Sequence, residues 1–193
     1  MIYNFCRSVL RIIYKVLFRL EAIGSEHVPK EGGVLLCSNH LSLLDPPTIG
    51  ILLKRKVHFM AKKELFDVFG FGWLIKELGA FPVKRGGVSK ESIKTSLTLL
   101  RTGHVMGIFP EGTRNKGDEG GIGKRGAATF ALRSDASVVP VAIIGHYKMF
   151  KKMKVVYGPP VDLTEFKESG VPDAAEKATE KIMSAIAELK KNS

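Results

Sequence analysis

A chain of 193 residues suits a single domain and is long enough to bury a hydrophobic core of its own. Its 30 lysines and arginines against 19 acidic residues leave a formal charge of +11, which favours an anionic partner: nucleic acid, anionic lipid or a phosphorylated substrate. The two cysteines, Cys6 and Cys37, have neither a disulfide framework nor metal-ligand spacing, so we expect reduced thiols, a reducing compartment and no metal requirement.

Residues 1–20 are predicted to form a basic amphipathic helix. Cations recur at every fourth position and share one helical face, at Arg7, Arg11, Lys15 and Arg19. They argue against a membrane-spanning helix, and the lack of an uninterrupted apolar stretch or a small-residue cleavage site argues against a signal peptide. Because most other residues are apolar, we expect a helix in the membrane interface. The alternative is a terminal helix packed on the core with a solvated basic stripe.

The segment after the first predicted strand carries the strongest chemical signal. That strand, residues 34–37, is apolar and ends in polar residues that include His40. Asp45 and two prolines then begin a helix, which Asp45 is expected to cap. His40 thus follows a strand and Asp45 begins a helix, which is where open α/β sheets place their chemistry.

His40 and Asp45 are the residue types that general-base chemistry needs. A neutral imidazole accepts a proton near pH 7, and a carboxylate bonded to its other nitrogen fixes the tautomer and stabilises the imidazolium. No Gly-x-Ser-x-Gly motif announces a seryl nucleophile, so we interpret His40 as a base that acts directly on a substrate hydroxyl. The alternative is structural: Asp45 caps the helix and His40 packs in the loop.

The rest of the chain alternates strands with helices. Further strands are predicted at residues 57–61, 80–83, 105–109, 138–144 and 154–157. Helices are predicted at 49–54, between Ser89 and Gly103, after Arg125 as far as Leu132, and at 173–191. Residues 64–78 are expected to be core, with a second membrane patch or an acyl-chain wall as alternatives, and Pro140 would be awkward in a central strand. The pattern indicates one α/β domain with a mixed, mostly parallel sheet and helices on both faces.

Polar residues follow three of these strands. They are Asn39, His40 and Asp45 after the first, Lys84 and Arg85 after another, and Glu111 and Arg114 after a third. Two arginines at one edge of the sheet suit a phosphate, because each guanidinium makes paired bonds to its oxygens. Either arginine alone would more simply form a surface ion pair. Together with a base and its orienting carboxylate, they predict a site for a phosphorylated alcohol.

Four segments in order resemble the motifs of the 1-acylglycerol-3-phosphate acyltransferase family. They are Asn39-His40-Leu-Ser42-Leu-Leu-Asp45 (the HX4D motif), Gly79-Ala-Phe-Pro-Val83-Lys84-Arg85, Phe109-Pro-Glu111-Gly112-Thr113-Arg114 and Val139-Pro140-Val141. The segment 60–65 is also similar to the family between the first two motifs, and the likeness covers roughly residues 34–144. Asn115 stands where serine is frequent in relatives, and the chain is shorter than many of them, which leaves its acyl-length selection open.

The resemblance implies a phospholipid-synthesis enzyme that transfers an acyl group from a thioester to lysophosphatidate without a covalent acyl-enzyme. His40 would be the general base, Asp45 would orient it, and Lys62 would steady the oxyanion, although Lys63 is equally cationic. Arg85, Glu111, Gly112 and Arg114 would hold the phosphoglycerol head group. Asn39, Ser42 and Thr113 would complete the substrate site.

The resemblance also implies an organisation and a location for the chain. Residues 1–23 would be the membrane-associating helix and residues 24–193 the acyltransferase domain, peripheral or monotopic on the cytoplasmic face of the cell membrane. Acyl-CoA or acyl carrier protein would be the co-substrate, with no other cofactor and no metal. Glycerol-3-phosphate or another lysolipid is an alternative acceptor. A non-catalytic membrane-binding module is an alternative function. Nucleic-acid binding is not supported, because the body of the chain has no basic stripe interleaved with aromatic residues.

Overall fold

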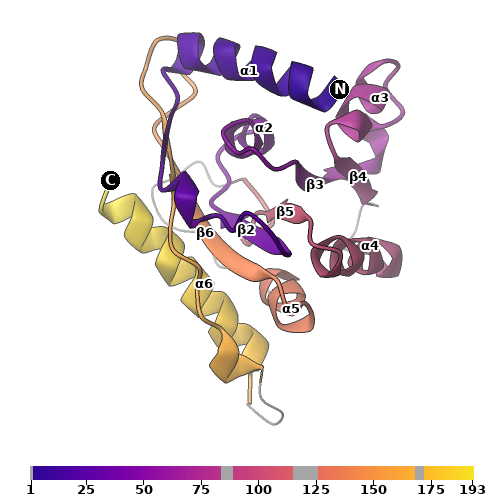
Figure 1. Cartoon of the computed structure of the whole chain (residues 1–193), viewed down its shortest axis with the longest axis vertical. Helices are drawn as coiled ribbons and strands as arrows, with labels where there is room; N and C mark the ends of the chain where they lie inside the picture. Colours follow the sequence, from indigo (N-terminus) through magenta and orange to yellow (C-terminus); the bar gives the residue numbers. More distant parts are fainter. Residues whose placement is uncertain (1, 84–88, 115–125, 168–171) are drawn as a thin grey trace.

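A seven-stranded sheet forms the centre of the molecule, with strand order β1-β7-β6-β2-β5-β3-β4 (Figure 1). The computed structural model describes residues 2–83, 89–114, 126–167 and 172–193. Its strands are β1 Glu21–Ile23, β2 Val34–Ser38, β3 Val57–Lys62, β4 Ala80–Val83, β5 Val105–Ile108, β6 Ser137–Ile144 and β7 Lys154–Tyr157. Strands β2 to β6 are parallel, while β7 pairs antiparallel with β6 and parallel with β1. The predicted mixed, mostly parallel α/β fold is confirmed.

Helices cover both faces of this sheet (Figure 1). They are α1 Ile2–Phe18, α2 Asp45–Gly50, α3 Phe71–Glu77, α4 Lys90–Arg101, α5 Gly126–Arg133 and α6 Ala174–Lys191, with short 3₁₀ turns η1 Ser25–His27, η2 Lys63–Leu65 and η3 Thr164–Phe166. One core lies between the sheet and α1 and α2, and the other lies under α4, α5 and α6. Alternate residues of β2 enter the two cores, which explains why that strand is apolar throughout.

Three local predictions need correction. The helix expected to start at Asp45 and to continue through 49–54 is α2, which starts at Asp45 as predicted but ends at Gly50. Residues 21–23, which the sequence analysis assigned to the N-terminal helix, form the edge strand β1 instead. Pro140 does lie in a central strand, opposite Cys37 of β2. It is tolerated because its carbonyl accepts from the Gly158 amide at 2.8 Å, so its nitrogen, on the same side of the strand, faces the end of β7 and not β2.

Helix α1 packs on the molecule through one face only. Tyr14 and Phe18 are buried in the core that α2 also lines, and Arg7 donates hydrogen bonds to the carbonyls of Leu53 (3.0 Å) and Lys54 (2.7 Å). Apolar side chains at helical spacing remain exposed on another face: Ile2, Phe5, Val9, Ile12, Ile13 and Val16. The helix therefore has an inward apolar face and an outward apolar face, with Arg7 taken out of the solvent-facing basic stripe.

Candidate active site

His40 and Asp45 form a hydrogen-bonded pair at the carboxyl end of β2. The distance from His40 Nδ1 to Asp45 Oδ2 is 2.7 Å, the imidazole is 16% exposed and the carboxylate is fully buried. Because a carboxylate only accepts hydrogen bonds, Nδ1 must carry the proton, which leaves Nε2 with a free lone pair in the neutral ring. This geometry is what a general base requires.

Four donors hold the buried Asp45 carboxylate. Besides His40, the amides of Leu41 (2.6 Å) and Ser42 (2.7 Å) donate to Oδ2, and the hydroxyl of Tyr147 donates to Oδ1 at 2.6 Å. Asp45 is the first residue of α2, and its side chain makes no helix-capping bond, so the expected capping role is wrong. The carboxylate instead folds the loop back on itself and fixes the imidazole.

Tyr147 lies in the connection between β6 and β7 and was not predicted to belong to the site. Burial first, and then the adjacent Asp45 carboxylate, raise the pKa of Tyr147 far above its usual value. Its hydroxyl thus keeps its proton at physiological pH and remains a donor to Asp45. Thr48 of α2 lies 2.8 Å from the same hydroxyl, and the ring packs edge-on against Phe18 of α1.

A row of aromatic rings fixes the plane of the imidazole. His40 stacks on Phe109, with 4.0 Å between ring centroids and 16° between planes, and Phe109 lies 6.1 Å from Phe59 of β3. Gly107 of β5 makes room for this row, because a Cβ there would lie 2.1 Å from the ring of Phe59. The stack thus spans β2, β5 and β3 and leaves the imidazole little freedom to rotate.

Asn39 and Ser42 support the loop rather than line an open site. The buried Asn39 amide donates to the carbonyl of Ile143 (3.0 Å) and accepts from the Ile143 amide (2.8 Å), so it continues the β2–β6 pairing with its side chain. The Ser42 hydroxyl accepts from the amide of Leu44 at 3.2 Å. The structure therefore shows that the Asn39 side chain joins the loop to β6, and its contact with substrate stays a prediction.

The third motif begins at the end of β5, beside β2 in the sheet. A tight turn joins the Phe109 carbonyl to the Gly112 amide at 2.9 Å, and the φ of +67° at Gly112 favours glycine. Glu111 is buried, whereas Thr113 and Arg114 are exposed. Because β2 and β5 are parallel, this turn lies at the same sheet edge as His40.

Two further predicted residues lie at or beyond the ends of neighbouring strands. Lys62 is exposed at the end of β3, paired in register with Val83 at the end of β4. Arg85 lies outside the described residues. Lys62 is therefore at the sheet edge that carries His40, with β5 between the two strands.

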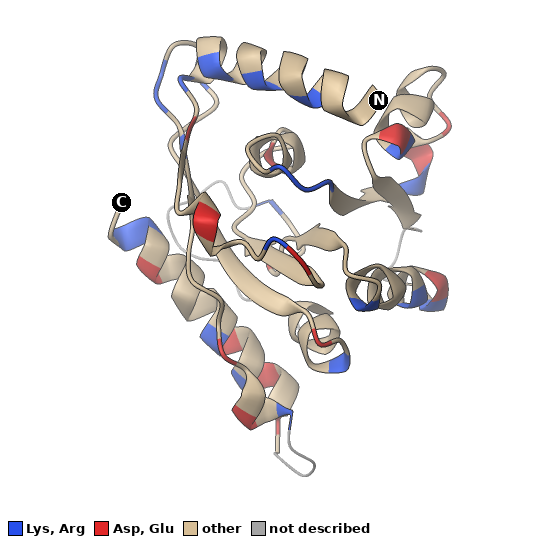
Figure 2. Ribbon diagram, viewed as in Figure 1, with Lys and Arg blue, Asp and Glu red and all other residues tan. Residues whose placement is uncertain are grey.

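Charge and apolar surface are distributed unevenly over the molecule. Figure 2 shows basic but no acidic residues along the ribbon of α1, while α6 has residues of both charges. Exposed apolar residues also gather around α3: Val68, Phe69, Phe71 and Trp73. Part of the segment 64–78 is thus surface, against the expectation that it is core. In the described ranges, none of the helices combines the length and the apolar content that crossing a bilayer would require.

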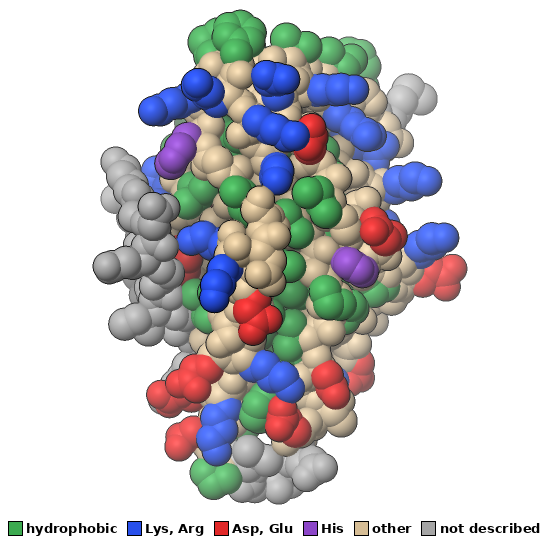
Figure 3. All heavy atoms as spheres, turned by 90° about the vertical axis from the view of Figure 1, so that its left-hand side faces the viewer, with side chains coloured by type: hydrophobic (Ala, Val, Ile, Leu, Met, Phe, Trp, Pro, Cys, Tyr) green, Lys and Arg blue, Asp and Glu red, His purple; other side chains and the backbone are tan. Residues whose placement is uncertain are grey.

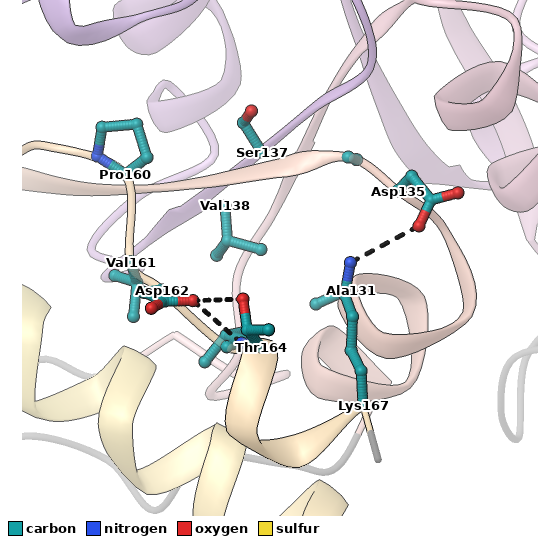
Figure 4. Close-up of a pocket in the computed structure, with 11 residues that line it drawn as sticks. Ala131, Asp135, Ser137, Val138, Pro160, Val161, Asp162, Thr164 and Lys167 are labelled. Atoms are coloured by element: carbon teal, nitrogen blue, oxygen red, sulfur yellow. Dashed lines mark hydrogen bonds and ion pairs between the residues drawn. The ribbon is translucent and has the colours of Figure 1, made fainter. Parts of the chain in front are cut away.

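A cavity of about 310 Å³ lies away from this site (Figure 4). It is lined by residues such as Ser137, at the start of β6, and therefore opens at the opposite end of that strand from His40. Its charged groups are satisfied locally, since Lys167 pairs with Asp135 at 3.5 Å and Asp162 accepts from the Thr164 hydroxyl at 2.6 Å. This cavity is therefore separate from the His40–Asp45 pair, which lies at the carboxyl edge of the sheet.

Comparisons with known proteins identify the family of this chain. A family model described as Acyltransferase matches residues 19–144. The 1-acyl-sn-glycerol-3-phosphate acyltransferase of Bacillus subtilis is 35% identical over 193 residues, which cover 97% of this chain and 96% of that protein. The enzyme of that name from Borreliella burgdorferi is 28% identical over 136 residues. This match covers 69% of this chain and 54% of that protein.

A solved structure shares the fold. The crystal structure of the 1-acyl-sn-glycerophosphate (LPA) acyltransferase from Thermotoga maritima superposes with a TM-score of 0.74 at 23% sequence identity. The match covers 97% of this chain and 78% of that one. At this identity the likeness concerns the fold alone.

Proposed function

The chain belongs to the 1-acylglycerol-3-phosphate acyltransferase family and is an acyltransferase, and on that premise we propose that it transfers a fatty acyl group from a thioester to lysophosphatidate, giving phosphatidate. The observation that carries this proposal is the His40–Asp45 pair, with Nδ1 committed to the carboxylate and Nε2 left as the base. The names of the relatives in Bacillus and Borreliella support the choice of acceptor.

In the proposed reaction His40 acts directly on the acceptor. Nε2 takes the proton of the acceptor hydroxyl as its oxygen attacks the thioester carbonyl, and the buried Asp45 stabilises the imidazolium that forms. When the tetrahedral intermediate collapses, the carbon–sulfur bond breaks and the imidazolium returns the proton to the leaving thiolate. Lys62, cationic and at the same sheet edge, is proposed to steady the oxyanion.

The phosphate of the acceptor is assigned to the turn after β5. Arg114 is exposed there, and a guanidinium makes paired, charge-assisted bonds to phosphate oxygens. Buried Glu111 and the tight turn at Gly112 give this arginine a rigid base. We assign Arg85 and Thr113 to the same head-group site.

The enzyme is proposed to work as a peripheral protein at the membrane that holds its substrate. The outward face of α1 supports this location, because six apolar side chains stay exposed there although the helix is already packed on the core. Arg11 and Lys15 are exposed on the same helix and would meet anionic head groups, which attract cations by roughly 1 kcal/mol each. The sequence predicted that Arg7 would meet the head groups as well. Arg7 instead donates its hydrogen bonds to the protein itself.

The donor and acceptor are tested by product analysis. The protein is incubated with acyl-CoA or acyl carrier protein thioester and, in parallel, with lysophosphatidate or glycerol-3-phosphate, and the lipid products are identified by mass spectrometry. Phosphatidate formed from lysophosphatidate is the expected result. Acylation of glycerol-3-phosphate alone would assign a different acceptor, and no product with any pair would favour a non-catalytic membrane module.

A further inference from the structure

The connection between β6 and β7 ends in an exposed apolar tip. Met149 and Phe150 are 63% and 62% exposed, and their neighbours Lys148, Lys151 and Lys152 are exposed as well. We propose that this tip is a second membrane contact, which inserts Met149 and Phe150 among the lipids of an anionic bilayer beside α1. The inference rests on the proposed function, because that function has a lipid substrate.

The backbone holds Phe150 outward at a conformational cost. Its φ is +62°, in the left-handed region that side chains other than glycine and asparagine rarely adopt. The Phe150 amide donates to the Leu17 carbonyl (2.5 Å), and the Met153 amide donates to the Phe18 carbonyl (3.0 Å). A large aromatic ring in a strained and exposed position is a feature that function explains better than stability.

These two hydrogen bonds also join the tip to the last turn of α1. Figure 1 shows the connection rising beside the carboxyl end of that helix. The tip therefore lies against the carboxyl end of α1, and Figure 1 shows both at the same end of the molecule. A partner that covers one is in reach of the other.

The charges around the tip identify the partner as an anionic membrane. In Figure 3 hydrophobic side chains occupy the outermost end of the molecule, and Lys and Arg side chains form a band immediately behind them. A bilayer has the complementary order, with acyl chains inside and phosphates at their border. Lys152, beside the tip in the sequence, pairs with Glu21 at 2.9 Å, which fixes the connection to β1.

The position of the tip also suits the reaction. Tyr147, two residues before Met149, bonds to Asp45 of the catalytic pair. Insertion of the tip would therefore hold the carboxyl edge of the sheet close to the head groups, from which a lysolipid could reach His40 without leaving the interface.

Substitution of the tip tests the inference on the full-length protein. Partition is measured by co-sedimentation with vesicles of phosphatidylcholine containing phosphatidylglycerol. Met149→Ser combined with Phe150→Ser should lower the partition coefficient by about tenfold or more. Ile23→Ser is the matched control, because Ile23 is an exposed apolar residue on edge strand β1, and it should leave partition unchanged.

Phe150→Gly separates binding from folding. Glycine relieves the positive φ, so this variant should unfold at a higher temperature than the wild type while it binds vesicles more weakly. Partition equal to the wild type in both tip variants would overturn the inference and leave the proposed reaction intact. If the wild type does not acylate lysophosphatidate, the proposed function is contradicted instead. That result is obtained without the tip variants.

Discussion

Tyr147 donates a hydrogen bond of 2.6 Å to Asp45 Oδ1, while the other oxygen of that carboxylate accepts from His40 at 2.7 Å. Tyr147 comes from the connection between β6 and β7, 102 positions from Asp45 in the sequence. It shares Asp45 with the base and also touches Phe18 of α1. The His40–Asp45 pair is therefore supported by the same packing that holds the N-terminal helix.

Tyr147→Phe should slow the reaction and change its pH dependence. The variant removes one hydrogen bond to Asp45, which is worth about 1 kcal/mol. If that stabilisation is lost from the transition state, kcat should fall roughly fivefold. The carboxylate then attracts the imidazolium more strongly, so the acidic limb of the kcat/KM profile should move to higher pH. Because a purely structural role would lower activity equally at all pH values, an unshifted profile would contradict the positioning role.

The two faces of α1 should respond differently to substitution. Phe5→Ser with Ile12→Ser removes exposed apolar groups, so we expect weaker binding to anionic vesicles and an unchanged unfolding temperature. Phe18→Ala empties a buried position and should cost about 3–5 kcal/mol of stability. Vesicle co-sedimentation and thermal unfolding distinguish the two. Deleting the whole helix would change membrane binding and stability together, because Tyr14 and Phe18 belong to the core.

Arg114→Ala should chiefly weaken binding of the phosphorylated acceptor. The loss of paired, charge-assisted bonds should raise the KM for lysophosphatidate by roughly ten- to a hundredfold. Arg114→Lys keeps the charge without the planar guanidinium, so its KM for lysophosphatidate should lie between those of the wild type and Arg114→Ala. Steady-state kinetics with each substrate varied in turn would check this, and an equal rise in the KM for the thioester would remove Arg114 from the head-group site.

The two cysteines should differ in reactivity. Burial raises the pKa of Cys37 to about 12, whereas Cys6 is half-buried near the surface of α1. At pH 8.5 a thiol reagent should therefore label one cysteine in the folded protein and both after denaturation. Since the unfolded thiol titrates near pH 9, Cys37 stabilises the fold fully below that pH, and this contribution is lost as the pH rises towards 12. Rapid labelling of both thiols in the native state would contradict the burial.

Local pattern predicted much of this molecule. The apolar runs located β2 to β7 within about a residue, and Ser89 caps α4 as expected by accepting from the Ser92 amide at 3.2 Å. The family suggested by the four motifs is confirmed by the comparisons. The pairing of His40 with Asp45 was one of two interpretations that their spacing allowed, because a loop of that length can bring a strand end and a helix start together, and the structure shows the pair.

Contacts between distant segments could not be read in the same way. Tyr147 and Phe109 follow strand ends as His40 does, but nothing local shows that one bonds to Asp45 and the other stacks on the imidazole. Strand β1 is a three-residue edge whose pairing depends on β7. Arg7 belongs by periodicity to the basic stripe, yet it bonds to the carbonyls of Leu53 and Lys54, in the turn that follows α2.

Thiol release from an acyl thioester, measured with and without lysophosphatidate for the wild type and His40→Ala, tests the central claim most directly. We expect release by the wild type that requires the acceptor, and a loss of about a hundredfold or more in His40→Ala, which should still fold and bind vesicles. Turnover retained by His40→Ala would contradict the general-base role. Release that is independent of the acceptor would mean that the protein hydrolyses thioesters instead of transferring their acyl groups.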